Sequence, residues 1–369
     1  MKAVGTRQRL DRLATLMNVP RVGVPPGRDI GVDALRGLAI LLVVLGHALS
    51  AAQNLLVTPA TDPRYYLHSF LYTFHMPLFM FVGGYVLYGR RFRVRDRAIR
   101  LLVPFFAWIP IYFLVNRYIL HWPAQFLHTL KQTILEPGFG LWFLPTLFLC
   151  SLLLIPVRHI EKRGRWLGIA YLVVAFVAVN LLPWEQLGLM QVKYFFFYFA
   201  LGYLAARYRP ALDRLDRKRV NAALLGAAAL FLALFSLLQY VHRNAPYTFP
   251  FSLYDLFETP AVYLTRYAMA VLGIVFAIGL VRLMGTGTVR RAFAWLGLVT
   301  MDIYVSHGLF VELTLGAGWI AVSISFLSGV FLPLALSLLV LRQFSATALV
   351  FLGIRPGSRV PGTAPGGGA

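Results

Sequence analysis

The chain has 369 residues, of which 59% are hydrophobic and only 13% are charged, and its mean hydropathy is +0.70. So few charges cannot cover the surface of a water-soluble globule, which excludes an ordinary soluble protein and predicts a polytopic membrane protein. Lysine and arginine outnumber aspartate and glutamate by 35 to 14. This excess indicates either nucleic-acid binding or a membrane-topology signal. The single cysteine, Cys150, lies in an apolar run, so an intramolecular disulfide and a cysteine-ligated zinc site are excluded.

Ten apolar stretches approach the length of about 20 residues that a transmembrane helix needs. The predicted fold is therefore all-α, a bundle of about ten transmembrane helices. The predicted spans are 35–56, 67–88, 99–120, 140–160, 166–183, 192–208, 219–241, 259–284, 292–313 and 316–342. The fifth and sixth spans are short, whereas the eighth and tenth are long enough to tilt or kink.

Basic residues concentrate in alternate loops, at 2–28, 90–100, 158–165, 207–219, 282–291 and 342–359. Short basic loops stay in the cytoplasm, so both termini are predicted to be cytoplasmic. Topology then accounts for the charge excess, and no nucleic-acid partner is expected, although the same arginines can meet anionic lipid headgroups. The predicted organisation has a basic cytoplasmic segment without a cleaved signal peptide (1–29), a transmembrane domain (30–342) and a disordered Gly/Pro-rich cytoplasmic tail (343–369).

The first span carries three ionisable residues, Asp33, Arg36 and His47. Each such side chain in hydrocarbon costs about 2.5–3.5 kcal/mol on insertion scales, so each is a candidate site residue. His47 lies eleven positions after Arg36, which places both on nearly the same helix face about 16 Å apart. Asp33 can pair with Arg36 at i, i+3. The alternative for Arg36 is an ordinary snorkelling side chain, but His47 is too deep in the span for that explanation.

Two further spans carry buried histidines. The second contains His75 beside Met76-Pro77, and the ninth contains Asp302, Tyr304 and His307. In the predicted topology His47, His75 and His307 lie at similar depth, so three helices can supply one imidazole cluster. For any one of these histidines alone, a helix–helix hydrogen bond is the simpler interpretation.

The basic run before the third span ends with Arg97 and Arg100, one helical turn apart. Paired guanidiniums on one helix face suit the phosphates of a nucleotide, because arginine forms bidentate bonds with phosphate oxygens. The arginines at 90–95 are interpreted as topology signals. Trp142, at the outer end of the fourth span, belongs either to an aromatic belt or to the wall of an acceptor site.

Five segments together resemble a known family: DALRGLAILLVVLGH, FHMPLFMFVGGYVLY, the Arg97–Arg100 pair, LWFL at the fourth span and IYVSHGLF in the ninth. They resemble the acyltransferase family 3 of integral-membrane O-acyltransferases. The resemblance implies a ten-helix enzyme that moves an acyl group, often acetyl, from cytoplasmic acyl-CoA to a hydroxyl of an extracytoplasmic carbohydrate or glycoconjugate. By this resemblance His47 is the essential histidine, Arg36 is its partner, and Arg97 and Arg100 hold the CoA phosphates. One departure is Gly83-Gly84, where many members have Ser-Gly.

The chemistry of the residues agrees with this implication. An alcohol that attacks a thioester needs a base, and imidazole is suited to that role near neutral pH. We expect acyl-CoA as co-substrate, with no metal and no bound cofactor, and a location in a bacterial inner membrane. Direct transfer is our hypothesis, with an acyl-enzyme as its alternative. The competing functions are a proton-coupled transporter that uses the histidines, Asp302 and Glu312 as a relay, and a scaffold with packed histidines. The acyl group, the acceptor and the oligomeric state stay open at this point.

Overall fold

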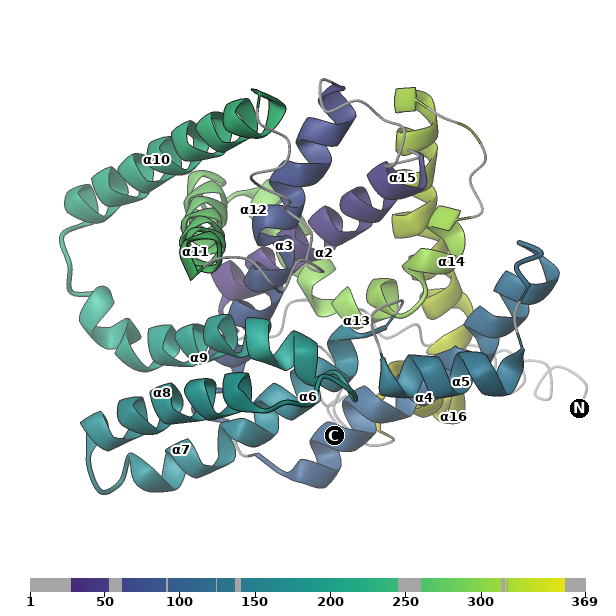
Figure 1. Cartoon of the computed structure of the whole chain (residues 1–369), viewed down its shortest axis with the longest axis horizontal. Coiled ribbons are helices and arrows are strands. Elements are labelled where there is room, and N and C mark those ends of the chain that lie inside the picture. Colours follow the sequence, from purple (N-terminus) through teal and green to yellow (C-terminus); the bar gives the residue numbers. More distant parts are fainter. Residues whose placement is uncertain are drawn as a thin grey trace, which may run out of the picture.

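The computed structural model describes residues 28–52, 62–90, 92–123, 125–136, 141–244, 260–312, 316 and 318–355, and within these every regular element is a helix (Figure 1). By length and composition, eight described segments can cross a membrane. They are Ile30–Ala51, Pro63–Leu87, Val94–Tyr118, Phe143–Ile160, Leu189–Leu212, Arg217–Tyr240, Val262–Leu283 and Gly318–Leu341. The chain is thus an all-α polytopic membrane protein, as predicted.

The helices follow one another in the order α2 (Ile30–Ala51), α3 (Pro63–Leu87), α4 (Val94–Tyr118), α5 (Phe126–Leu135), α6 (Phe143–Leu153), α7 (Ile155–Ile160), α8 (Arg165–Leu181), α9 (Leu189–Leu212), α10 (Arg217–Asn244), α11 (Pro260–Leu283), α12 (Thr288–Leu298), α13 (Thr300–Tyr304), α14 (His307–Glu312), α15 (Gly318–Leu336), the π-helix η1 (Ser337–Leu341) and α16 (Ser345–Leu352). Two of the ten predicted spans differ from a full transmembrane helix. The fifth is α8, with 17 residues, and the ninth is broken into α12, α13 and α14.

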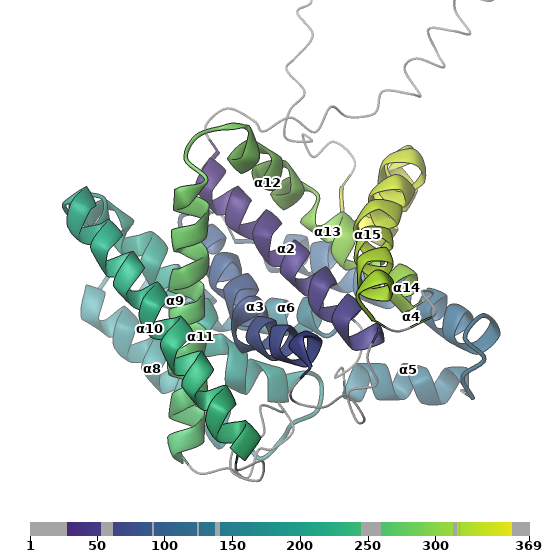
Figure 2. The same cartoon turned by 90° about the horizontal axis from the view of Figure 1, so that it is seen from above.

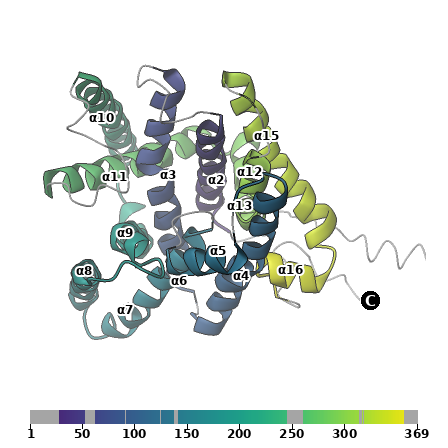
Figure 3. The same cartoon turned by 45° about the vertical axis from the view of Figure 1, so that its right-hand side comes forward.

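Helices α2 and α3 lie at the centre, with α9, α10 and α11 on one side and α14 and α15 on the other (Figures 1 and 3). Helix α2 begins at Ile30, five residues before the predicted start. Asp29 caps it by accepting hydrogen bonds from the backbone N–H groups of Gly31 (2.9 Å) and Val32 (3.2 Å). The earlier start brings Asp33 into the first helical turn.

Two helix pairs pack with their backbones in close approach. Helix α2 packs along α12 (Figure 2), and α3 packs along α9. A Cβ atom at Gly37 would lie 1.8 Å from the backbone oxygen of Phe293, and one at Gly84 would lie 1.9 Å from that of Phe199. Only glycine allows these approaches, as in other small-residue helix contacts in membranes.

The break in the ninth span is stabilised by side chains that bind backbone carbonyls. Thr300 Oγ1 donates to the Gly297 oxygen (2.8 Å), and His307 Nδ1 donates to the Tyr304 oxygen (2.7 Å). Non-helical backbone at membrane depth is tolerated only inside protein or along a water-filled cavity. Tyr304 and His307 are both buried, so the break occurs in the protein interior.

The chain after η1 differs from the predicted disordered tail. Residues Ser345–Leu352 form α16, which packs on α4 (Figure 3). The Trp108 Nε1–H donates to the Phe351 oxygen at 2.9 Å, and the two rings are 5.5 Å apart. The run SATALVFL is apolar enough to bury one face, which the Gly/Pro-rich composition of the whole tail obscured.

Candidate active site

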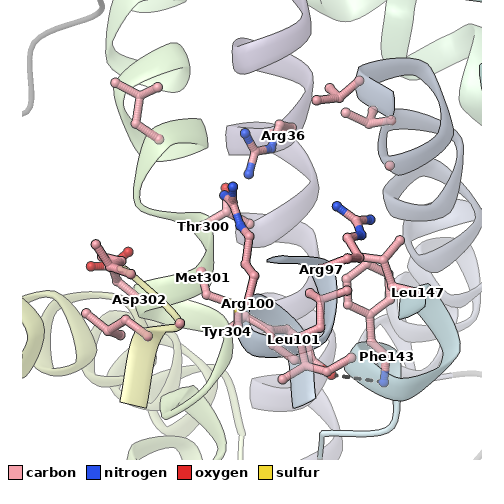
Figure 4. Close-up of a pocket in the computed structure, with 18 of the residues that line it drawn as sticks. Arg36, Arg97, Arg100, Leu101, Phe143, Leu147, Thr300, Met301, Asp302 and Tyr304 are labelled. Atoms are coloured by element: carbon pink, nitrogen blue, oxygen red, sulfur yellow. Dashed lines mark hydrogen bonds between the residues drawn. The ribbon is translucent and has the colours of Figure 1, made fainter. Parts of the chain in front are cut away.

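A cavity of about 460 Å³ opens between the N-terminal ends of α2 and α4, the C-terminal end of α3, and α13. Seven arginines and two aspartates line it: Arg28, Arg36, Arg90, Arg97, Arg100, Arg342, Arg355, Asp96 and Asp302. The guanidinium groups of Arg36, Arg97 and Arg100 point into this common space (Figure 4). The cavity therefore carries a strong excess of positive charge at the end of the bundle that is predicted to face the cytoplasm.

Asp33 neutralises part of this charge. Its carboxylate accepts hydrogen bonds from Arg28 Nε (2.7 Å) and Nη2 (2.6 Å), whereas Arg36 Nη1 lies 3.7 Å away. The predicted pair of Asp33 with Arg36 is thus the weaker of two, and Arg28 is the closer partner. The Arg36 guanidinium also lines the cavity, where it can meet a ligand.

Asp302 is held in a second ion pair. It accepts hydrogen bonds from Arg342 Nε (2.5 Å) and Nη2 (2.9 Å), and also from Ser337 Oγ. Both members of the ion pair are almost inaccessible to solvent. Ser337 and Arg342 come into place because the chain passes from α15 through the π-helix η1, a local irregularity often found at functional sites.

Three arginines of the lining, Arg90, Arg97 and Arg100, make no ion pair with a carboxylate among the described residues. Arg97 Nε instead donates to the buried hydroxyl of Ser151 (3.1 Å). Arg90, in the loop between α3 and α4, was expected only to mark topology, yet it lines the cavity. Partial burial and the neighbouring Arg28 lower the pKa of its guanidinium.

Three like charges that share one cavity repel one another, and a bound anion would relieve this repulsion. The arrangement therefore suits an anionic ligand, and the planar fork of arginine suits phosphate oxygens in particular.

Beyond the far end of the cavity lies a pair of imidazoles. The rings of His47, on α2, and His307, at the start of α14, are 5.0 Å apart at an angle of 61°. A carbonyl oxygen can only accept, so His307 Nδ1 carries the proton that is donated to Tyr304. His307 Nε2 is buried and has no hydrogen-bond partner among the described residues, whereas the His47 side chain is exposed.

Tyr304 joins the cavity to this histidine pair. It lines the cavity and its ring lies 5.7 Å from that of His307. The backbone N–H of Phe143 donates to the Tyr304 hydroxyl at 3.3 Å, and Phe143 also lines the cavity (Figure 4). His47 itself is outside the lining, so contact between the two regions runs through Tyr304 and His307.

The third predicted histidine, His75, makes its ring contact with Tyr72 at 4.8 Å, and its Nδ1 donates to the Leu71 oxygen at 2.8 Å. A further polar group, formed by Ser50 and His68, lies beside it. Ser50 Oγ is 2.9 Å from His68 Nε2, and the His68 ring stacks on Tyr72 at 3.9 Å. Both Ser50 and His47 lie near the C-terminal end of α2, on the opposite side of the bundle from the arginines.

Trp142 lies away from the cavity lining. Its ring stacks on that of Phe195 at 5.0 Å, which attaches the start of α6 to α9. The residue that follows it, Phe143, is the one that reaches the cavity. Two adjacent aromatic residues at a helix start point to different neighbours, and composition alone does not say which of them faces the site.

Fold and site together define a multi-pass membrane protein with an arginine-lined cavity next to a histidine pair. The family model described as an acyltransferase domain matches residues 29–342, and the chain belongs to this family. The chain is therefore a multi-pass membrane member of an acyltransferase family.

Two curated relatives share part of the sequence. The Nodulation protein NolL of Mesorhizobium japonicum is 28% identical over 189 residues, which cover 49% of this chain and 48% of that protein. The Nodulation protein NolL of Sinorhizobium fredii is 29% identical over 195 residues, which cover 49% of each. The matched part thus spans about half the length of these relatives. No solved structure matches the chain.

Proposed function

We propose that the protein transfers an acyl group from acyl-CoA, bound from the cytoplasm, to a hydroxyl of an extracytoplasmic carbohydrate or glycoconjugate, with acetyl as the expected group. The observation that carries this proposal is the cavity with Arg90, Arg97 and Arg100 next to a histidine pair. These three guanidiniums make no ion pair with a carboxylate within the part of the chain that the structure describes. Acyl-CoA carries both an anionic nucleotide, which would match the arginines, and a reactive thioester, which would match the histidine pair. A bacterial inner membrane is the location we propose.

The donor would lie with its phosphates among the arginines and its pantetheine arm directed past Phe143 and Tyr304. Arg97 and Arg100 would bind phosphate oxygens, and Arg36 would contribute a third guanidinium. The acceptor would approach His47 from the opposite end, where Ser50, His68 and Tyr72 present polar atoms.

In the proposed reaction, His47 removes the proton of the acceptor hydroxyl while the oxygen attacks the thioester carbonyl carbon. The tetrahedral intermediate then collapses, the carbon–sulfur bond breaks, and the His47 imidazolium returns the proton to the leaving thiolate. The products are an ester and free CoA. We assign His307 the role of orienting His47, whose ring lies 5.0 Å away. His307 Nδ1 donates to Tyr304, so Nε2, which has no hydrogen-bond partner among the described residues, would accept the second N–H of His47 once the donor is bound.

A proton-coupled transporter is the competing function from the sequence, and it would use the histidines, Asp302 and Glu312 as a proton relay. The carboxylate of Asp302 is instead occupied by Arg342 and Ser337. This geometry favours a structural role for Asp302 over a relay.

The test is the release of free CoA from acetyl-CoA by membranes that contain the protein, in the presence of an envelope glycan extract. We expect His47→Ala to abolish the release while the protein stays inserted. His159→Ala is the matched control, because His159 is exposed on α7 and away from the site. Substantial CoA release by the His47→Ala variant would overturn the assignment of the base.

A further inference from the structure

The end of α16 and the three residues after it form one wall of the arginine cavity. Leu352, Gly353, Ile354 and Arg355 all line it, although they lie beyond residues 29–342, which the family model matches. The family match ends at residue 342, so it assigns no role to this wall.

Gly353 holds this wall against α4. Its φ angle of +65° is one that glycine readily adopts, and a Cβ atom there would lie 2.4 Å from the backbone oxygen of Arg100. The backbone of the segment is thus in direct contact with the helical turn that carries Arg97 and Arg100. Together with the hydrogen bond from Trp108 to Phe351, this contact fixes where the following residues lie.

Arg355 is the charged member of the segment. It forms an ion pair with Asp96, the residue that precedes Arg97 on α4, and both members of the pair line the cavity. About a third of the Arg355 side chain is exposed, so the guanidinium can meet an anion without a large desolvation cost. Asp96 is also the carboxylate nearest in sequence to the arginine pair that is proposed to bind the donor phosphates.

We propose that Arg355 binds a phosphate of the acyl-CoA donor, and that the segment Leu352–Arg355 is part of the donor site. This inference rests on the proposed function. The phosphomonoester of CoA alone carries about −1.5 to −2 charges at pH 7. A guanidinium beside Arg97 and Arg100 would add to the neutralisation of this charge, while Asp96 opposes it.

The ion pair provides a test that separates binding from simple attachment of the segment. Arg355→Gln and Asp96→Asn break the same pair but change the charge of the cavity in opposite directions. If Arg355 binds the donor, Arg355→Gln should raise the Kd for CoA about tenfold, the effect of one lost charge-assisted hydrogen bond. Asp96→Asn should leave the Kd unchanged or lower it, and Arg355→Lys should retain part of the affinity.

The experiment measures equilibrium binding of CoA to the full-length protein purified in a neutral detergent. Arg214→Gln, an exposed arginine outside the cavity lining, serves as the matched control and should leave the Kd unchanged. Equal weakening by Arg355→Gln and Asp96→Asn would mean that the pair only attaches the segment, and no weakening by Arg355→Gln would equally overturn the proposal.

An anionic lipid headgroup offers the same phosphate chemistry as CoA. Displacement of bound CoA by short-chain phosphatidylglycerol would assign the cavity to lipid and overturn the proposal. If the unmodified protein fails to bind CoA at all, the proposed function fails with it. Loss of only the Arg355 effect, with CoA binding intact, leaves the proposed function standing.

Discussion

The ion pair of Asp302 with Arg342 allows a quantitative prediction about stability. Asp302 is 2% exposed and accepts three hydrogen bonds, two from Arg342 and one from Ser337. In Asp302→Asn, one carboxylate oxygen becomes an NH2 group, so a single oxygen is left to accept these hydrogen bonds. The NH2 group then faces at least one donor of Arg342 or Ser337, which it cannot bind. Arg342 then remains buried with its charge uncompensated. Removal of one member of a buried pair costs about 3–5 kcal/mol, and we expect Asp302→Asn to fall in this range.

The free energy of unfolding can be measured by titration with sodium dodecyl sulfate in mixed micelles. Asp213→Asn is the matched control, because Asp213 pairs with Arg209 at 3.4 Å but is 67% exposed, and this change should cost less than about 1 kcal/mol. The double variant Asp302→Leu with Arg342→Met should recover much of the loss, since no buried charge is left unpaired. If Asp302→Asn costs no more than Asp213→Asn, the structural role of the Asp302–Arg342 pair is refuted.

Other predictions concern helix packing, the donor and the acceptor. Gly37→Ala should prevent the close packing of α2 on α12 and reduce the yield of folded protein. Gly226→Ala is the control, because the space around Gly226 is open, and it should leave the yield unchanged. Equal yields of the two variants in size-exclusion chromatography would refute this packing role of Gly37. Arg97→Gln should raise the Kd for CoA about tenfold in a binding titration, and an unchanged Kd would remove Arg97 from the donor site. Ser50→Ala and Tyr72→Phe should raise the KM for the acceptor with no change in CoA affinity, and a changed CoA affinity would instead place them on the donor side.

Hydropathy was sufficient for most of the fold, because eight long apolar runs correspond to eight helices of spanning length. The break in the ninth span could not be predicted in the same way. Its sequence has neither a proline nor a glycine pair at Val299 or Ser306 to mark the interruption. The break depends on tertiary surroundings that bury the freed backbone, and periodicity does not report them.

The candidate site was predictable in its residue types but less so in its pairings. Arg36, Arg97 and Arg100 do line one cavity, and His47 does contact His307. Arg28 pairs with Asp33 because the chain just before α2 places its guanidinium beside the first turn of that helix, and the sequence does not specify this position. The pair of Asp302 with Arg342 joins residues 40 apart across a π-helix, and no local pattern signals it.

In the proposed function, one donor molecule connects the arginine cavity to the histidine pair. The most direct test is a structure of the full-length protein with a non-hydrolysable acetyl-CoA analogue, determined by electron cryomicroscopy. We expect phosphate oxygens in contact with Arg97 and Arg100, and the acyl carbonyl carbon beside the His47–His307 pair. Phosphates bound elsewhere, or an acyl group remote from both histidines, would contradict it.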